Sequence, residues 1–550
     1  MIRNLLISLI LILFFSTSSH GWLHERYHTY ETMEAEIHEI AENYPEIVKI
    51  DTLAWLPTLY DYIYDDVDSM AIYAVKISDN VEIDEDEPVF HLNGLHHAEE
   101  IISPEIILYM LNDLAENYGV DEEKTSWVDD NEIWLVPMIN PRGHFIVVDS
   151  IDAAYRKNTR DNNENGIFDY DPGIVDEDGA PDYDGVDINR NYDFNWGEPD
   201  TNYLSETYAG TAPFSEPETQ AIRDLFLATR PTFAINYHSS RTGNFAEAVI
   251  YPWKKGGILS PDYPSIYEVA DNVCERIIRD YSPGTYTLRP GAYGKYNEDG
   301  GYWYDGGFAR NWQYATVGTI SLLVEAGADI VPPWPYVDDI CERNLVGAYW
   351  LFERIKYGSI TGHVTDAETG NPLEASLTII DSGENNYPDM LIVTTSDPTY
   401  GRYRRILEVN NPTAGPYTLQ FSVENYETVI FEDVDVSPDS VVVIDVAMTD
   451  TIIEDESYDP SVPSKISLDQ NYPNPFNPVT TIQYAIPEKS NVKLAVYNTA
   501  GQEVETLINK KQEQGSYSIK WNAENYASGV YFYTLDVNGS KLTKKLVLLK

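Results

Sequence analysis

Residues 88–119 read PVFHLNGLHHAEEIISPEIILYMLNDLAENYG and show how the larger part of this chain is built. Their first residues form a short apolar run that predicts a buried strand, and the turn GLHH follows it. Apolar residues at helical spacing then predict a helix over 99–119 that Gly119 ends. Strand, turn and helix in this order are the repeating unit of an α/β domain. The turn holds two overlapping His-x-x-Glu pairs, His96/Glu99 and His97/Glu100.

The flanking sequence continues the alternation of helices and strands. A helix is predicted over 33–45, ended by Pro45, and buried strands are predicted over 131–141, 231–240 and 318–327. We expect an α/β fold with a mixed central sheet flanked by helices. Ligands of such sheets bind at the carboxyl ends of strands. His97, His238 and Glu325 all follow predicted strand ends, so we expect them to meet there.

Composition narrows the class of protein. The chain has 550 residues, more than one hydrophobic core organises. Lys plus Arg is 36 and Asp plus Glu is 90, so the net charge is 36 − 90 = −54, which disfavours nucleic acid and anionic lipid as partners. The two cysteines, Cys274 and Cys341, provide no disulfide framework, and whether they pair is open.

The N-terminus predicts export. Arg3, the apolar run 5–15 and STSSHG have the order of a secretory signal peptide, which we place at residues 1–20. A membrane span needs roughly 20 apolar residues, so we expect no transmembrane segment in the mature chain. We also expect no pro-segment before the catalytic region.

The C-terminal part changes pattern. Residues 359–449 contain period-2 strands separated by Gly, Pro and Asn turns, which predict a small β-sandwich. Residues 450–465 read as a polar linker, and residues 466–550 again as short strands with turns. The fold class is therefore α/β with two small C-terminal β-sandwich domains.

Several side chains have the chemistry of a metal-dependent hydrolase. A catalytic zinc needs three protein ligands and an open position for water. A His-x-x-Glu pair alone is weak evidence, and a lone His238 is more often a hydrogen-bonded core residue. Glu325 ends an apolar run, where a carboxylate is costly unless it is paired, solvated or working as a base. Arg156 and Arg190 lie in polar loops, and arginine suits a carboxylate or an oxyanion.

The motifs occur in the order seen in one family. HHAEE, the NPRG of 140–143, YRK, VDINRNYD, NYHS and VEAG together resemble the zinc carboxypeptidases of the carboxypeptidase A and carboxypeptidase T type over residues 27–357. The resemblance implies His97, Glu100 and His238 as zinc ligands and Glu325 as the base that activates zinc-bound water.

The same resemblance implies roles for three further residues. Arg156 would help to stabilise the oxyanion, and Asn189 and Arg190 would hold the substrate's terminal carboxylate. The partners would be peptides or proteins with a free C-terminus, from which residues are removed.

Three positions depart from the family pattern or leave it ambiguous. Glu99 stands where the family usually has arginine. The family's active-site tyrosine falls in YWYDGG, where Tyr302 fits best and Tyr304 or Trp303 are alternatives. Arg310 falls at the side-chain specificity position and would favour an acidic C-terminal residue. The alternative is that Arg310 is a surface charge or replaces the charge lost at Glu99.

An acidic loop offers a second metal site. RDNNENGIFD places oxygen ligands at alternating positions around Gly166, as calcium loops do, and a solvated acidic insertion is the equal alternative. The candidate calcium ligands are Asp161, Asn163, Asn165 and Asp169.

The C-terminal modules carry resemblances of their own. ITGHVTDAETGNPLEASLTI resembles the transthyretin-like, carboxypeptidase-regulatory type of sandwich. NYPNPFNPVTTIQYAIP with SGVYFYTL resembles the sorting domain of type IX secretion, which implies the secretion machinery as a partner and a secreted or surface-attached protein. We expect a secreted zinc metallocarboxypeptidase. The alternatives are a related amide or cell-wall peptide hydrolase, or an inactive surface binding protein on this fold.

Overall fold

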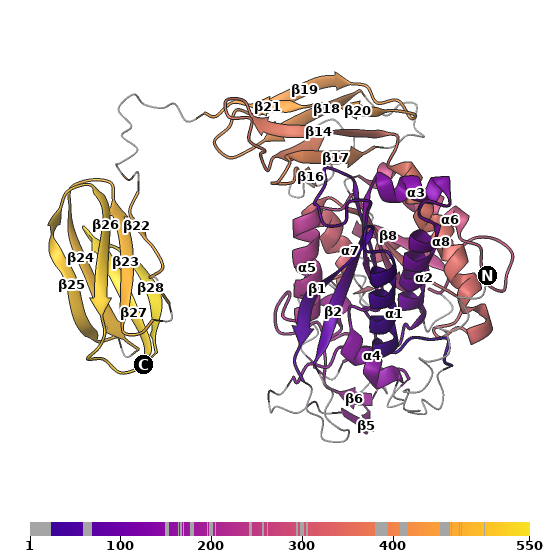
Figure 1. Cartoon of the computed structure of the whole chain (residues 1–550), viewed down its shortest axis with the longest axis horizontal. Helices are drawn as coiled ribbons and strands as arrows, with labels where there is room; N and C mark the ends of the chain where they lie inside the picture. The colour runs from indigo at the N-terminus through magenta and orange to yellow at the C-terminus, as the bar shows by residue number, and fades with distance from the viewer. Residues whose placement is uncertain are drawn as a thin grey trace, which may run out of the picture. The chain divides into compact units, whose positions relative to one another are not determined.

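A computed structural model gives the arrangement of the chain (Figure 1). It describes residues 24–58, 69–148, 153–162, 164, 168, 170–175, 181–194, 196, 202–203, 205–240, 245–255, 258–260, 262–292, 295–296, 302–303, 306–379, 394–407, 416–451, 463, 465–471, 473–474, 476–499 and 501–549. The predicted signal peptide lies outside the described residues. By its internal contacts the chain divides into two compact units, Met1–Thr451 and Ile452–Lys550.

One mixed sheet organises the first unit. Its strands are β1 (Val48–Leu56), β2 (Met70–Ile77), β3 (Val89–Asn93), β4 (Glu132–Val136), β7 (Phe233–His238), β8 (Ala248–Lys255), β9 (Ile258–Leu259), β10 (Thr287–Ala292) and β13 (Ile320–Glu325). The order is β1-β2-β4-β3-β7-β13-β8-β10, with β9 beside β8. Strands β4, β3, β7 and β13 run parallel, so their carboxyl ends share one edge. This arrangement, with helices on the sheet and all-β sheets after it, confirms the predicted fold class.

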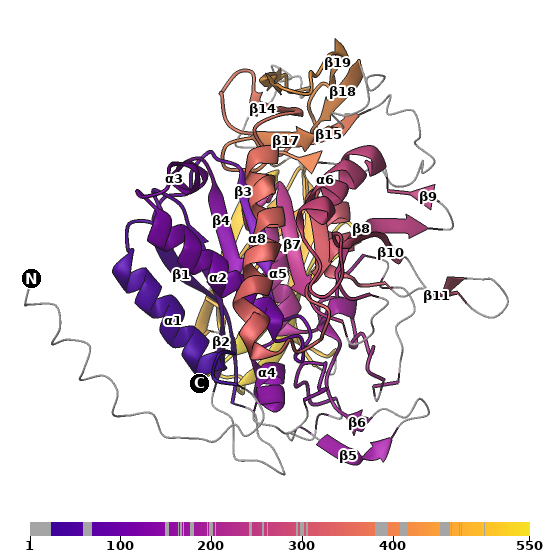
Figure 2. The same ribbon diagram turned by 90° about the vertical axis from the view of Figure 1, so that its right-hand side faces the viewer.

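Helices cover both faces of this sheet. They are α1 (Tyr30–Asn43), α2 (Ile102–Asn117), α3 (Glu122–Asp129), α4 (Pro141–Val148), α5 (Pro217–Thr229), α6 (Tyr263–Arg276), α7 (Ala309–Trp312) and α8 (Val337–Arg354). Helices α1, α2, α6 and α8 share one hydrophobic core and lie on one face (Figure 2). Helices α5 and α7 belong to a second core on the other face.

Local sequence explains where these helices begin and end. Thr29 caps α1 through a reciprocal capping box with Thr32. Helix α2 begins at Ile102 rather than at Glu99, because Glu99 and Glu100 belong to the preceding turn. The short elements of the connecting regions are η1 (Ile188–Arg190), η2 (Gln313–Val317), η3 (Trp334–Tyr336), β5 (Tyr170–Val175), β6 (Pro181–Tyr183), β11 (Lys295–Tyr296) and β12 (Tyr302–Trp303).

A β-sandwich ends the first unit. Its strands are β14 (Ser359–Asp366), β15 (Ser376–Ile379), β16 (Thr394–Thr395), β17 (Arg402–Ile406), β18 (Tyr417–Ser422), β19 (Val429–Val434), β20 (Val441–Val443) and β21 (Val446–Met448). One sheet has the order β17-β14-β20 and the other β16-β15-β18-β19, and a separate core lies between them. Whether this sandwich is transthyretin-like stays a prediction, as do the domain boundaries.

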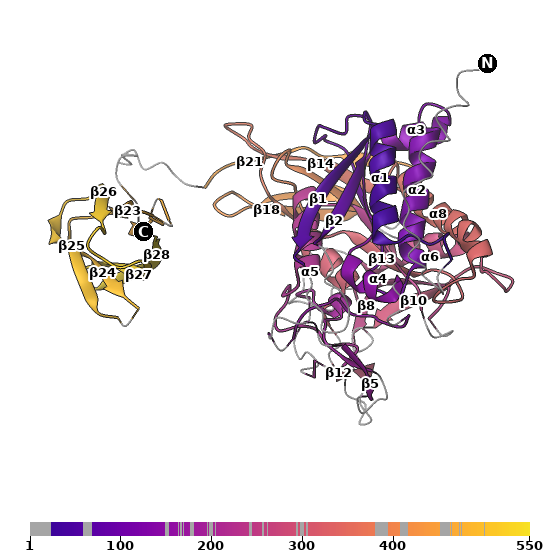
Figure 3. The same cartoon turned by 60° about the horizontal axis from the view of Figure 1, so that its bottom comes forward.

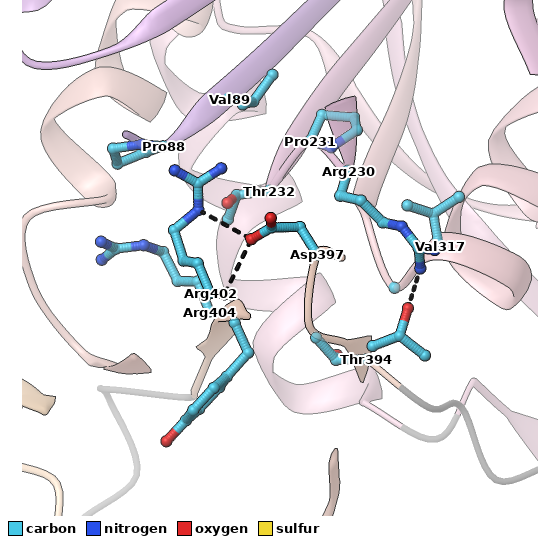
Figure 4. A pocket seen from close by; sticks show the side chains of 13 residues that line it. Pro88, Val89, Arg230, Pro231, Thr232, Val317, Thr394, Asp397, Arg402 and Arg404 are labelled. Atoms are coloured by element: carbon cyan, nitrogen blue, oxygen red, sulfur yellow. Dashed lines mark hydrogen bonds and ion pairs between the residues drawn. The ribbon is translucent and has the colours of Figure 1, made fainter. Parts of the chain in front are cut away.

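Polar contacts join this sandwich to the α/β domain. Tyr400 donates to the carbonyl of Asp84 at 2.5 Å, and His363 Nε2 lies 2.7 Å from Asp86. Figure 4 shows a small polar cavity between the two, where Arg230 contacts Thr395 and Arg402 turns toward Asp397. The loop before β3 is thus held by the sandwich.

The second unit is a further sandwich. Its strands are β22 (Ser467–Leu468), β23 (Val479–Ile486), β24 (Ser490–Asn498), β25 (Glu503–Gln512), β26 (Gly515–Asn522), β27 (Gly529–Val537) and β28 (Ser540–Leu548). Its two sheets, β22-β23-β26 and β25-β24-β27-β28, face each other (Figure 3). One hydrophobic core that includes Trp521 lies between them.

Two further findings bear on the sequence predictions. Cys274 and Cys341 are both free and buried, so they do not pair with each other. Of the residues that the structure describes, none belongs to a helix that is both long and apolar enough to cross a membrane.

Candidate metal and catalytic site

The carboxyl edge of the sheet brings distant residues together. His238 is the last residue of β7 and Glu325 the last of β13, and the two are register partners. His97 and Glu100 lie in the turn between β3 and α2. Ser103 braces this turn: its hydroxyl donates to the carbonyl of Glu100 at 2.6 Å and accepts from the backbone N–H of Leu95 at 2.9 Å.

His97, Glu100 and His238 form a compact buried cluster. Their ligand-capable atoms all lie within 4.8 Å of one another. His97 Nδ1 is 2.8 Å from Glu100 Oε1, His238 Nδ1 is 2.6 Å from Glu100 Oε2, and the two Nδ1 atoms are 3.1 Å apart. Two ring nitrogens this close cannot both carry protons. Two imidazoles and one carboxylate are a donor set of catalytic zinc sites, so these residues fit a zinc ion.

The charges in the cluster are strongly coupled. Burial works to lower the pKa of His97, but the carboxylates of Glu100 and Asp187 raise it to about 9. Burial lowers the pKa of His238 to about 4. One imidazole is thus drawn toward the charged form and the other toward the neutral form.

Asp187 connects the cluster to Arg156. Asp187 Oδ1 lies 3.2 Å from His97 Nε2, and Oδ2 accepts from Arg156 Nε at 3.0 Å. Burial alone would raise the pKa of Asp187, but Arg156, Arg190 and His97 hold it well below its usual range. An orienting carboxylate behind a ligating histidine fixes the ring's tautomer and direction. Sequence reasoning missed this role, although Asp187 stands in the quoted motif VDINRNYD next to Asn189 and Arg190.

Glu325 lies beside the cluster as a half-buried acid with one buried oxygen, Oε2. Its Oε2 has no hydrogen-bond partner within the described part of the chain. Burial, and next the charge of Glu100, raise the pKa of Glu325 to about 8, against the opposing effect of His97 and Arg156. A raised pKa makes the ionised carboxylate a stronger base, and general bases work best when their pKa lies near the working pH.

Arg156 faces acidic neighbours. Its Nη1 lies 3.9 Å from Glu99 and 3.9 Å from Glu100. Although burial lowers the pKa of Arg156, the carboxylates of Asp187, Glu99 and Glu100 raise it above the ordinary value. Arg156 is therefore charged, and Glu99 brings a negative charge to the place where the family pattern has a positive one.

Asn189 and Arg190 lie next to the cluster on η1. Asn189 accepts from the backbone N–H of Ala309 at 3.0 Å, and its amide lies 3.5 Å from His238 Nε2. The guanidinium of Arg190 stacks on the ring of Phe308 at 4.3 Å, and that of Arg310 lies 4.5 Å from the same ring. Phe308 thus keeps two cations together, a role that sequence reasoning also missed.

Other predicted site residues fall elsewhere or outside the described set. Arg310 is buried rather than a surface charge. Tyr302 belongs to β12, and its side chain is outside the described part, as is all of Tyr304. Of the predicted calcium ligands only Asp161 is described; Asn163, Asn165 and Asp169 are not.

His96 does not join the cluster. Its Nε2 lies 3.1 Å from the hydroxyl of Tyr192, and its ring stacks on that of His238 at 5.3 Å. Burial holds the pKa of His96 well below its usual range, so the ring is a neutral neighbour. Of the two overlapping pairs, the structure brings His97/Glu100 to His238.

Known carboxypeptidases are similar to a large part of this chain. Carboxypeptidase B of Helicoverpa zea is 28% identical over 262 residues, which cover 46% of this chain and 53% of that protein. Carboxypeptidase D of Anas platyrhynchos is 24% identical over 416 residues, 74% of this chain and 25% of that protein. The chain thus spans about half the length of the first relative and a quarter of the second.

Among solved structures, the carboxypeptidase A of Helicoverpa armigera is 20% identical, with 62% of this chain and 76% of that chain covered and a TM-score of 0.46. Residues 470–549 match the secretion system C-terminal sorting domain. Residues 33–346, more than half of the chain, match the zinc carboxypeptidase family. The chain therefore belongs to the zinc carboxypeptidase family.

Proposed function

We propose that this protein is a secreted zinc-dependent carboxypeptidase that removes residues from the C-terminal ends of peptides. The observation that carries the proposal is the convergence of His97, Glu100 and His238 at the sheet edge, with Glu325 beside them and Arg156 and Arg190 around them. Family membership supports the same reaction class.

His97 Nδ1, the Glu100 carboxylate and His238 Nδ1 would hold the zinc ion. Zinc, when bound, polarises the scissile carbonyl and acidifies the attacking water. Asp187 keeps the proton of His97 on Nε2, which leaves Nδ1 as a lone-pair donor. The 3.1 Å approach of the two Nδ1 atoms agrees with such sharing of one cation.

Glu325 would move the proton in this reaction. Its buried Oε2 accepts a proton from the attacking water and delivers it to the amine of the departing residue, so that the carboxylate is restored. Arg156, charged and held by Asp187, would stabilise the negative charge that develops on the carbonyl oxygen.

Arg190 and Asn189 would bind the terminal carboxylate of the substrate. Stacking on Phe308 fixes the Arg190 guanidinium, and a planar guanidinium matches a carboxylate in a bidentate way. An enzyme that requires this carboxylate cuts only at chain ends. Tyr302 is proposed as an additional substrate contact, from the family pattern alone.

Arg310 is proposed to select an acidic C-terminal side chain. It is buried, stacked on Phe308, and close enough to Glu325 to lower that residue's pKa, against the larger effect of burial. Hydrolysis of matched peptides ending in Glu, Phe or Lys tests this selectivity. Equal rates, or a clear preference for Phe or Lys, would show that Arg310 does not set it.

The remaining parts are proposed to serve export. The sorting-domain match supports secretion or attachment to the cell surface, with the secretion machinery as a partner. The predicted signal peptide agrees with this route. A calcium ion at the loop of Asp161 stays a proposal, which metal analysis of the purified protein would test together with zinc.

The decisive experiment combines zinc content with the release of C-terminal amino acids by wild type and Glu325→Gln. We expect one zinc per chain in both proteins and stepwise release by the wild type, with release by the variant slower by ~10²–10⁴. Zinc without peptide hydrolysis would favour another amide substrate, for which Glu99 beside Arg156 gives a reason. Loss of both would leave a binding protein.

A further inference from the structure

Arg142 is a buried cation that contacts no counter-charge in the described part of the chain. It lies in the first turn of α4, and its side chain is 8% exposed. Its Nε and Nη2 are buried and have no hydrogen-bond partner among the described residues. Burial lowers the pKa of Arg142 and the charge of Glu218 opposes this shift, although the described side chains of Arg142 and Glu218 form no ion pair. A buried charge left in this way is costly unless something else satisfies it.

A cavity of about 350 Å³ lies in front of Arg142. Its lining includes Glu216 and Glu218, with Asn158 between them, and apolar side chains such as Phe168. The Asn158 amide donates to Glu216 at 2.9 Å and to Glu218 at 3.2 Å. A single water needs roughly 30 Å³, so this space is large enough for a small molecule.

The cavity therefore joins two opposite charges that do not touch. Glu216 is already paired with Arg160 at 2.7 Å, whereas no cation of the described residues forms an ion pair with Glu218. Burial, and then the charge of Glu216, raise the pKa of Glu218 to about 7. A positive group near Glu218 would relieve this acid, and a carboxylate in the cavity would supply the counter-charge that the Arg142 guanidinium lacks among the described residues.

We propose that this cavity binds a free amino acid, with its carboxylate on Arg142 and its ammonium group toward Glu218. The site is separate from the metal cluster and does not depend on the proposed hydrolysis. Asn158 links the two regions, since its side-chain oxygen accepts from the backbone N–H of Val186, next to Asp187, at 2.8 Å.

The test measures binding of three probes to the full-length, zinc-loaded protein by calorimetry: glycine, acetate and inorganic phosphate. We expect glycine to bind more tightly than acetate or phosphate. Arg142→Gln should weaken glycine binding at least tenfold. Glu218→Gln should weaken the binding of glycine but strengthen the binding of acetate, because it removes the acidic group and keeps the Arg142 cation.

Controls separate this site from the catalytic one and from misfolding. Arg190→Gln, which affects the proposed substrate clamp, should leave glycine binding at the cavity unchanged. Arg142→Lys keeps the charge but loses the planar guanidinium, so it should bind glycine with intermediate affinity. Equal glycine affinity in wild type and Arg142→Gln, loss of binding in Arg190→Gln, or tighter binding of phosphate than of glycine would each overturn the proposal.

Discussion

Replacing Asp187 by asparagine keeps the size of the side chain but removes the charge that holds both His97 and Arg156. In the wild type one oxygen lies 3.2 Å from His97 Nε2 and the other accepts from Arg156 Nε at 3.0 Å. Asparagine presents one neutral acceptor in place of two charged ones. In the Asp187→Asn variant the ring of His97 would lose its fixed tautomer. Arg156 would keep only the weaker interactions with the carboxylates of Glu99 and Glu100, both 3.9 Å from its Nη1.

The magnitude follows from these contacts. Loss of an orienting partner behind a ligating histidine typically lowers metal affinity ~10–100-fold, or about 1.4–2.7 kcal/mol. A hydrogen bond to a charged group contributes about 1.5–3 kcal/mol, so Arg156 should also be less well positioned and kcat should fall with zinc saturating.

The assay is a zinc titration against a chelator of known affinity, with kcat measured at saturating zinc. The matched control is Asp193→Asn, because Asp193 is an exposed aspartate in the same loop region. We expect the control to equal the wild type. If Asp187→Asn binds zinc within twofold of the wild type and keeps its kcat, the role assigned to Asp187 is wrong.

Three further predictions concern stability. His28 lies 2.8 Å from Glu105 and 2.7 Å from Glu36; burial opposes its charged form, but these acids raise its pKa to about 10. Because the pKa of His28 is raised in the folded state, this stabilisation is complete below about pH 6.5 and disappears as pH rises toward 10. The difference in unfolding free energy between wild type and His28→Gln should therefore be a few kcal/mol at pH 6 and shrink over that range in denaturant titrations. A difference that stays constant with pH would contradict this prediction. Gly307 has φ 75°, and a Cβ there would lie 1.9 Å from the Arg190 carbonyl oxygen. Gly307→Ala should therefore lower the free energy of unfolding by at least about 2 kcal/mol and raise KM. An unchanged melting temperature and KM would contradict this. Arg354→Leu should lower the free energy of unfolding by about 3–5 kcal/mol, because it removes the 2.9 Å ion pair with the buried carboxylate of Glu268. A melting temperature equal to that of the wild type would refute this.

Much of the architecture was readable from local patterns. Apolar runs that end in His238 and Glu325 predicted strands, and both residues end strands that pair in register. The start of α2 was predicted at Glu99, too early, because helical periodicity continues through a turn that Ser103 braces with side-chain hydrogen bonds. Periodicity cannot show such a tertiary interaction.

The parts of the site that sequence reasoning missed depend on contacts between separate loops. Asp187 acts through His97 and Arg156, which come from other segments, and Phe308 acts by lying between Arg190 and Arg310. Nothing in the spacing of these residues reports such a contact. Arg142 was quoted only as part of NPRG, and its burial without a partner became visible only with the fold.

The sandwich that follows the α/β domain contacts a loop that precedes the metal-binding turn in the sequence by about ten residues. Its Tyr400, His363 and Arg402 all contact residues 84–86, a few positions before β3 (Val89–Asn93) begins. Strand β3 in turn leads directly into the turn that carries His97. A mechanical load applied to the sandwich, by a cell surface or by a bound partner, would therefore pass first into the strand that presents the metal-binding histidine.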